Sequence, residues 1–195
     1  MNICVYGASS NAIDPKYIEA IERLGEEMGG RGHGLVFGGG ASGAMGASAR
    51  GCARGGAPMI LGIAPSFFRV DGVLYEGCTE FIHTNTMRER KQLLEDRSDA
   101  FIIAPGGVGT FDEFFEMLTL KQLGRHNKPM VIFNIDGYYD LMLAMLRQTA
   151  KEEFMNESTM DLYKVLEDPT EILDYIETYD EPMHEVSFFK KINEG

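Results

Sequence analysis

The chain has 195 residues, of which 44% are hydrophobic and 25% charged, and its net charge is −12. This length suits one domain with a sizeable core, and the composition is typical of globular proteins. The acidic charge argues against non-specific binding to nucleic acid or to a membrane, because both need a basic surface.

Short β-rich runs alternate with helical patterns along the chain. The strands are expected, in chain order, at 3–6, 35–37, 59–63, 79–84, 99–104 and 130–134. The helices are expected at 15–28, 44–54, 86–97, 110–123, 138–151, 160–166 and 169–178. This alternation predicts an α/β fold of three layers, in which a mainly parallel sheet is flanked by helices. We expect one domain over 1–179 and a C-terminal tail over 180–195.

Three cysteines (Cys4, Cys52 and Cys78) are scattered along the sequence. They form no CxxC pair, and the histidines (His33, His83, His126 and His184) have no metal-ligand spacing, so we expect neither disulfides nor a metal site. The first residues are too short an apolar run for a signal peptide, and no stretch approaches the roughly 20 apolar residues that span a bilayer. We therefore expect a cytoplasmic protein with no cofactor.

Three glycine-rich turns, at 7–10, 38–46 and 105–110, each follow a predicted strand and precede a predicted helix. Parallel strands bring such turns to the edge of the sheet where α/β folds bind ligands. Without Cβ atoms, the backbone amides can approach an anion, and the next helix adds its free amides. One such turn is often only a tight connection, but three at one edge favour a binding site. None is a GxxxxGK[ST] loop or a clean GxGxxG fingerprint.

Charged residues stand close to these turns. Glu113 is expected in the first turn of the helix after the 105–110 loop, where free amides and the helix dipole would lower its pKa and keep it ionised. The competing interpretation is a capping charge without a catalytic role. Arg90 and Lys91 lie three and four residues after Met87, on a stripe shared with Leu94. Cations on an inward-facing stripe need an anionic partner; otherwise this is a solvated helix face.

The segment 66–77 contains several aromatic residues and is compatible with either a lid or an interface, and the sequence leaves both open.

Residues 105–113, Pro-Gly-Gly-Val-Gly-Thr-Phe-Asp-Glu, resemble the PGGxGTxxE signature of the LONELY GUY (LOG) family, the cytokinin riboside 5′-monophosphate phosphoribohydrolases. Residues 87–91 resemble the Arg-Lys motif that the family has just upstream. Further matching stretches are 4–10, 38–46, 122–124 with 128–129, and 137–140. The resemblance runs in order from the first residue to about residue 178.

The resemblance implies a Rossmann-like fold and a homodimer with its sites near the subunit interface. It also implies hydrolysis of a nucleoside 5′-monophosphate, either AMP or an N6-modified, cytokinin-type AMP, to the free base and ribose 5-phosphate. The catalytic residues would be Glu113 and Arg90. The residues expected to bind the nucleotide are Gly7, Ser9, Gly39, Gly40, Gly43, Met87, Lys91, Gly106, Gly107, Val108, Gly109, Thr110 and Thr119.

The chain departs from the family pattern at Arg88, at Phe111-Asp112 and over 66–80, which leaves base specificity open. Two other functions also stay open: a non-catalytic nucleotide-binding or sensing protein, and a nucleosidase for other nucleoside monophosphates. Members of the family are often labelled lysine decarboxylases. No lysine here is evidently placed to form a Schiff base in a pyridoxal-phosphate site.

Overall fold

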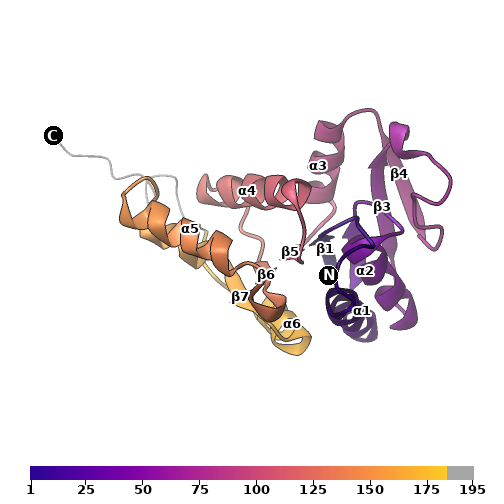
Figure 1. The fold of residues 1–195 in the computed structure, drawn as a ribbon, viewed down its shortest axis with the longest axis horizontal. Coiled ribbons are helices and arrows are strands. Elements are labelled where there is room, and N and C mark those ends of the chain that lie inside the picture. Colours follow the sequence, from indigo (N-terminus) through magenta and orange to yellow (C-terminus); the bar gives the residue numbers. More distant parts are fainter. Residues whose placement is uncertain (184–195) are drawn as a thin grey trace.

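A parallel sheet runs through the middle of the molecule (Figure 1). In the computed structural model, which describes residues 1–183, seven strands lie in the order β4-β3-β2-β1-β5-β6-β7, and every neighbouring pair is parallel. The strands are β1 (Asn2–Tyr6), β2 (Gly34–Phe37), β3 (Ile60–Pro65), β4 (Glu80–Thr84), β5 (Ala100–Ile103), β6 (Met130–Phe133) and β7 (Lys164–Leu166). The predicted parallel α/β fold is therefore confirmed.

Helices cover both faces of the sheet (Figure 1). One face carries α1 (Pro15–Gly30), α2 (Gly43–Arg54) and α6 (Pro169–Glu177), and the other carries α3 (Met87–Asp96), α4 (Val108–Gln122) and α5 (Asp140–Lys151). Successive residues of β1 alternate between the two cores: Ile3 and Val5 face the α1 side, whereas Cys4 and Tyr6 face the α4 side. Among the described residues, no helix has both the length and the apolar composition of a membrane span.

The strand order reverses between β1 and β5. The chain runs outward from β1 through β2 and β3 to β4, and it then crosses back to β5 and runs outward on the other side. Two loops that leave adjacent strands toward opposite sides create a crevice at the carboxyl end of the sheet, which is where open α/β sheets bind ligands. The switch point here lies beside the turns after β1 and β5.

The predicted helix at 160–166 is wrong. The structure has a 3₁₀ turn at Glu157–Leu162 and then the edge strand β7, whose Lys164, Val165 and Leu166 pair with β6. A three-residue strand is too short to show a period of two, and its pairing with β6 decides its conformation. The other expected elements agree with the structure to within one or two residues at each end. Most of the predicted tail, residues 184–195, lies outside the described residues.

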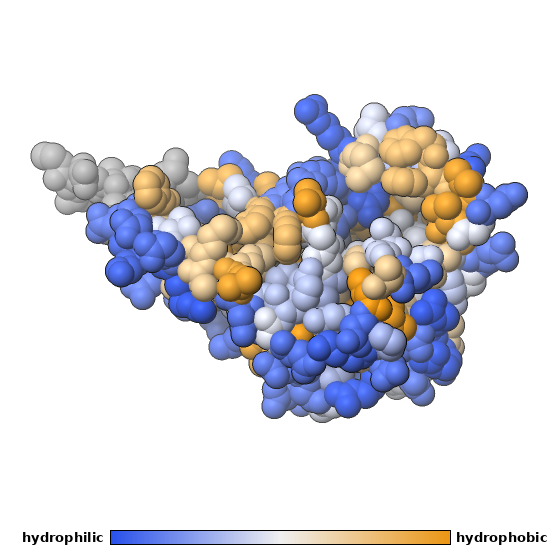
Figure 2. Space-filling view, in the orientation of Figure 1, coloured by the Kyte–Doolittle hydropathy of each residue, from blue (hydrophilic) through white to orange (hydrophobic). Residues whose placement is uncertain are grey.

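Exposed apolar side chains gather in several places in the space-filling view (Figure 2). One group lies beside α4 and α5, and another lies at the upper right, over the 66–77 segment. On α5 and the turn before it, Tyr138, Leu141 and Met145 are exposed at spacings of three and four residues, so they form one stripe, named here the α5 stripe. Leu141 exposes 87% of its surface.

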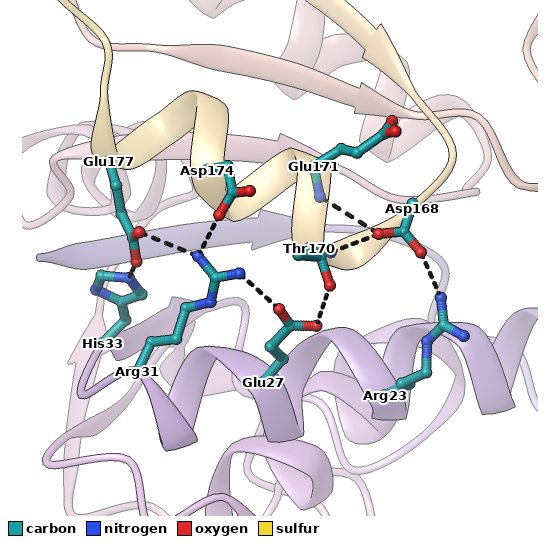
Figure 3. Close-up of polar contacts among 9 residues, drawn as sticks. All are labelled: Arg23, Glu27, Arg31, His33, Asp168, Thr170, Glu171, Asp174 and Glu177. Carbon is teal, nitrogen blue, oxygen red and sulfur yellow. Dashed lines mark hydrogen bonds and ion pairs between the residues drawn. The ribbon is translucent and has the colours of Figure 1, made fainter.

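A cluster of ion pairs fastens the last helix to the first (Figure 3). The Arg31 guanidinium, just after α1, lies 2.8 Å from Glu27 on its own helix. It also contacts two carboxylates of α6, Asp174 at 2.7 Å and Glu177 at 3.0 Å. Glu177 additionally contacts His33 Nε2 at 2.7 Å. The cluster thereby joins residues that are more than 140 positions apart in sequence.

Candidate active site

The three glycine-rich turns line one cavity of about 690 Å³ at the carboxyl ends of β1, β2 and β5. A cavity of this size suits a small-molecule ligand. Ten of the residues expected from the sequence line it: Gly7, Ser9, Gly40, Met87, Arg90, Gly107, Val108, Gly109, Thr110 and Glu113. The turns also contact each other, since the amide of Ala8 donates to the carbonyl of Pro105 at 3.1 Å. The structure therefore brings most of the expected residues together on one cavity.

The start of α4 presents free backbone donors to this cavity. The N-cap residue is Gly107, which has no side chain to cap the helix, and the amides of Val108, Gly109 and Thr110 lie in the first turn, where helical partners are missing. A Cβ atom added at Gly107 or Gly109 would meet no atom of the described chain within 4 Å. Open space, unpaired amides and the positive end of the helix dipole together favour an anion at this position.

Arg90 and Glu113 form a buried ion pair beside these amides. Nη1 of Arg90 lies 2.7 Å from Oε1 of Glu113, and Nε of Arg90 donates to the carbonyl of Ile63 at 3.2 Å. The two residues expose only 9% and 8% of their surfaces, yet both line the cavity. The anionic partner that a buried Arg90 requires is therefore Glu113.

The expected setting of Glu113 needs correction. Because α4 begins at Val108, Glu113 lies in its second turn, beyond the free amides and the strongest field of the dipole. Burial raises the pKa of the Glu113 carboxyl, and the positive charge of Arg90 only partly opposes this rise. The predicted lowering of its pKa is therefore wrong. A carboxylate whose pKa is raised is a stronger base. The positive charge of Arg90 stabilises the ionised form of the Glu113 carboxylate.

Five of the expected site residues do not line the cavity of the single chain. Gly39 and Gly43 have positive φ angles, and they shape the turns rather than face the cavity. Gly106 does not line the cavity, and a side chain there would collide with Thr110. Lys91 is engaged by Asp112 at 3.2 Å and Glu116 at 2.8 Å. Thr119 is exposed further along α4.

One wall of the cavity was not predicted. The 66–77 segment pairs with the turn after β2: the amide of Tyr75 donates to Gly39, and the amide of Ala41 donates to Val73, both at 2.9 Å. This pairing brings apolar residues of the segment, among them Phe68, Val73 and Leu74, onto the cavity. The sequence shows the apolar residues but gives no sign of the pairing, so it left the segment unassigned.

The fold and this cavity define a Rossmann-like α/β protein with a turn of free backbone amides and a buried acid on one cavity. Residues 45–176 match the sequence model of a family described as "Possible lysine decarboxylase". A probable cytokinin riboside 5′-monophosphate phosphoribohydrolase of Oryza sativa subsp. japonica is 35% identical over 183 residues, which cover 94% of this chain and 72% of the relative. A cytokinin riboside 5′-monophosphate phosphoribohydrolase of Arabidopsis thaliana is 34% identical over 177 residues, with coverages of 91% and 83%. The chain belongs to this family, the LOG family.

Solved structures agree on the fold. The molybdenum cofactor binding protein of Rippkaea orientalis superimposes with a TM-score of 0.67 at 19% identity, over 91% of this chain and 94% of that one. The molybdenum cofactor carrier protein of Chlamydomonas reinhardtii gives a TM-score of 0.68 at 19% identity, with coverages of 90% and 95%. At this identity the likeness concerns the fold alone, and it confirms the Rossmann-like architecture.

Proposed function

We propose that this protein hydrolyses the N-glycosidic bond of a nucleoside 5′-monophosphate, either AMP or an N6-modified, cytokinin-type AMP. The products are the free base and ribose 5-phosphate. The observation that carries the proposal is the buried Arg90–Glu113 pair, which faces the same cavity as the free amides of α4. A 5′-phosphate on those amides leaves the ribose beside Glu113. The names of the relatives agree with this chemistry.

In this mechanism, Glu113 acts on water and on the sugar. Cleavage of the C1′–N bond builds positive charge on the ribose ring, as in glycoside hydrolysis. The carboxylate of Glu113 stabilises that charge and accepts a proton from the attacking water. The water oxygen forms the new bond to C1′, and the electron pair of the broken bond leaves with the base, which takes up a proton.

Arg90 and the 105–110 loop position the reacting groups. The guanidinium fixes one oxygen of Glu113 and leaves the other for water or for a ribose hydroxyl. Bound phosphate supplies binding energy remote from C1′, and that energy orients the sugar. The base then lies toward the apolar wall formed by Met45 and the residues of the 66–77 segment, which suits a flat base with an apolar substituent.

The label of lysine decarboxylase does not fit the described residues. Such a decarboxylase uses a lysine in Schiff-base linkage to pyridoxal phosphate. None of the described residues that line the cavity is a lysine, and Lys91, beside it, is held by two carboxylates. The proposed reaction therefore contains no pyridoxal-phosphate step.

A non-catalytic nucleotide carrier is the second candidate, because the same fold also serves in cofactor carrier proteins. The Glu113 carboxylate favours a catalytic function over that of a carrier. Binding a phosphate needs donors and positive charge, and a buried acid next to the sugar would only oppose it. A nucleosidase for other nucleoside monophosphates would use the same residues and differs only in the base it accepts.

One substrate panel separates these candidates. The protein is incubated with AMP, N6-isopentenyl-AMP and the other common nucleoside monophosphates, and free base and ribose 5-phosphate are measured. We expect release from AMP-type substrates and a loss of about 10²- to 10⁴-fold in kcat for Glu113→Gln. Glu95→Gln is a matched control, since Glu95 is a half-buried carboxylate outside the cavity. Absence of product from every nucleotide would favour the carrier, and full activity of Glu113→Gln would refute the proposed mechanism.

We also propose that the protein is a homodimer with its sites near the interface. The support is the α5 stripe, whose Leu141 is almost fully exposed, and its nearness to Val108, which lines the cavity and exposes 83% of its surface. Tyr138 of the stripe contacts the 105–110 loop directly. We expect Leu141→Glu to convert a dimer into monomers in light scattering, whereas Leu123→Glu, at the end of α4, should not. A monomeric parent protein would contradict the proposal.

The proposed location is the cytoplasm. Its support is the state of the cysteines, since Cys4, Cys52 and Cys78 are all free thiols, as expected for a reducing compartment.

A further inference from the structure

Two tyrosine hydroxyls contact the backbone of the segment that leads into α4. The hydroxyl of Tyr139 donates to the carbonyl of Ala104, and the hydroxyl of Tyr138 donates to the carbonyl of Gly106, both at 2.7 Å. Both tyrosines belong to the connection between β6 and α5, which is more than 30 residues further along the chain. The connection between β6 and α5 therefore holds these two carbonyl groups, those of Ala104 and Gly106.

The contact with Gly106 decides where an amide of the loop points. In a trans peptide, the C=O and the N–H lie on opposite sides of the bond, and no described peptide is cis. When the Gly106 carbonyl is held by Tyr138 outside the cavity, the N–H of Gly107 is turned away from Tyr138. The preceding carbonyl, that of Pro105, accepts from Ala8 and is fixed as well. Two adjacent glycines would not keep this orientation by themselves, because glycine has access to more backbone conformations than other residues.

The tyrosines themselves are firmly held. The amide of Tyr139 donates to Asn134 Oδ1 at 2.7 Å, and Asn134 Nδ2 donates to Asp140 Oδ1 at 2.9 Å. The Tyr139 side chain is fully buried, and burial raises the pKa of its hydroxyl, which therefore stays protonated and able to donate. The ring of Tyr138 packs edge-on against Tyr17 of α1 at 5.7 Å between centroids. The donors are thus preorganised.

We propose that Tyr138, with Tyr139 behind it, is a positioning residue that holds the 105–110 loop ready to bind the phosphate of a nucleotide. Neither tyrosine lines the cavity, so each acts through the backbone that it contacts. The inference rests on the proposed function for the identity of the phosphate group. It does not require that the bound nucleotide be hydrolysed.

A purely structural role predicts something different. If the hydroxyls only satisfy two backbone carbonyls, their removal lowers the stability of the fold and affects all ligands alike. If they orient the loop, removal weakens binding of ligands that carry a phosphate and leaves the corresponding nucleoside unaffected. The ratio of the AMP and adenosine affinities distinguishes the two roles.

The test is Tyr138→Phe in the Glu113→Gln protein, in which turnover is suppressed during binding measurements. Affinities for AMP, adenosine and ribose 5-phosphate are measured by calorimetry or by displacement. We expect the affinities for AMP and ribose 5-phosphate to fall about fivefold, as for one hydrogen bond, and that for adenosine to stay unchanged. Tyr179→Phe is the control, because its hydroxyl contacts Asn127 beyond the other end of α4.

Three outcomes overturn the inference: an AMP affinity that does not change, equal losses for AMP and adenosine, or a parent protein that binds neither AMP nor ribose 5-phosphate. A protein that binds AMP but releases no base would refute the proposed hydrolysis and leave the role of Tyr138 standing. Tyr139→Phe gives a second measurement, with its fold checked by thermal melting. In the active protein, Tyr138→Phe should raise KM for the nucleotide and largely preserve kcat.

Discussion

The guanidinium of Arg90 occupies the space that a side chain at Gly38 would need. A Cβ atom at Gly38 would collide with Nη2 of Arg90 and would also approach the sulfur of Met45 at 2.9 Å. Gly38 directly follows β2 and lines the cavity. Although Gly38 is far from Glu113 in sequence, its lack of a side chain leaves the space in which Arg90 contacts Glu113. The Gly38–Gly40 turn therefore leaves room for the ion pair and also lines the cavity.

This relationship predicts the effect of Gly38→Ala. The new methyl group must displace Arg90, and displacement by about 1 Å is enough to lower kcat by about a hundredfold. Gly30→Ala is the control, since a Cβ there meets no atom within 4 Å. Base release is measured for both variants together with their melting temperatures. Full activity of Gly38→Ala would mean that the position of Arg90 does not depend on the absence of a side chain at Gly38.

A substitution at Gly109 tests the proposed phosphate contact of the 105–110 loop separately from the ion pair. A Cβ at Gly109 meets no protein atom but extends into the cavity, so Gly109→Ala should fold normally and gain up to about 1 kcal/mol of helix stability. Its methyl group would occupy space that a phosphate needs. We expect KM for the nucleotide to rise at least about tenfold, or roughly 1.4 kcal/mol of lost binding.

Gly106→Ala provides the contrast to Gly109→Ala. A Cβ at Gly106 would collide with the side chain of Thr110, so this variant should lose stability as well as affinity. Chemical denaturation and nucleotide binding are measured for both. An unchanged KM for Gly109→Ala would mean that the phosphate does not bind at this turn.

Local features of the sequence predicted much of this molecule. The alternation of strand and helix patterns predicts the layers of the fold, and the glycine-rich turns after strands predict the edge of the sheet at which the cavity lies. Both patterns can be recognised because they involve residues that are close together in the sequence. The stripe of Met87, Arg90 and Leu94 left open whether Arg90 faces inward or lies on a solvated helix face. Arg90 is buried, whereas Met87 is exposed.

Contacts between segments that are distant in the chain could not be predicted from the sequence. The helix α4 begins two residues earlier than expected, so Glu113 lies in its second turn and not in its first. The burial of Glu113 raises its pKa, whereas the sequence predicted a lowered pKa. The segment Lys164–Leu166 forms the strand β7 because it pairs with the edge of β6. The contact of Tyr138 with Gly106 depends on two connections that only the folded sheet brings together.

The cluster around Arg31 predicts how strongly α6 is held to the body. Arg31 contacts three carboxylates and exposes 24% of its side chain, and removal would leave those acids facing one another. We expect Arg31→Gln to lower the free energy of unfolding by about 1–3 kcal/mol in urea. Arg23→Gln is the matched control, because among the described residues Arg23 pairs only with Asp168 (Figure 3), and its side chain is 65% exposed. It should change stability by less than about 1 kcal/mol. Equal effects would mean that the cluster adds nothing beyond single surface pairs.

The pH dependence of base release should report the ionisation of Glu113. The proposed mechanism needs the carboxylate, so kcat/KM should fall as the pH drops through its pKa. Burial raises that pKa above the ordinary glutamate value of about 4.3, whereas Arg90 lowers it. The acid limb of the profile is therefore expected above the ordinary range.

Removing the charge of Arg90 should move this limb to higher pH. In Arg90→Gln the carboxylate loses its nearest cation, so protonation becomes easier and the midpoint rises, while the maximal rate also decreases. Arg88→Gln, on the exposed side of the same helix, should leave the midpoint in place. Profiles of kcat/KM are recorded for the three proteins over the range in which each stays folded. A midpoint that is unmoved or shifted to lower pH in Arg90→Gln would show that the acid limb belongs to a group other than Glu113.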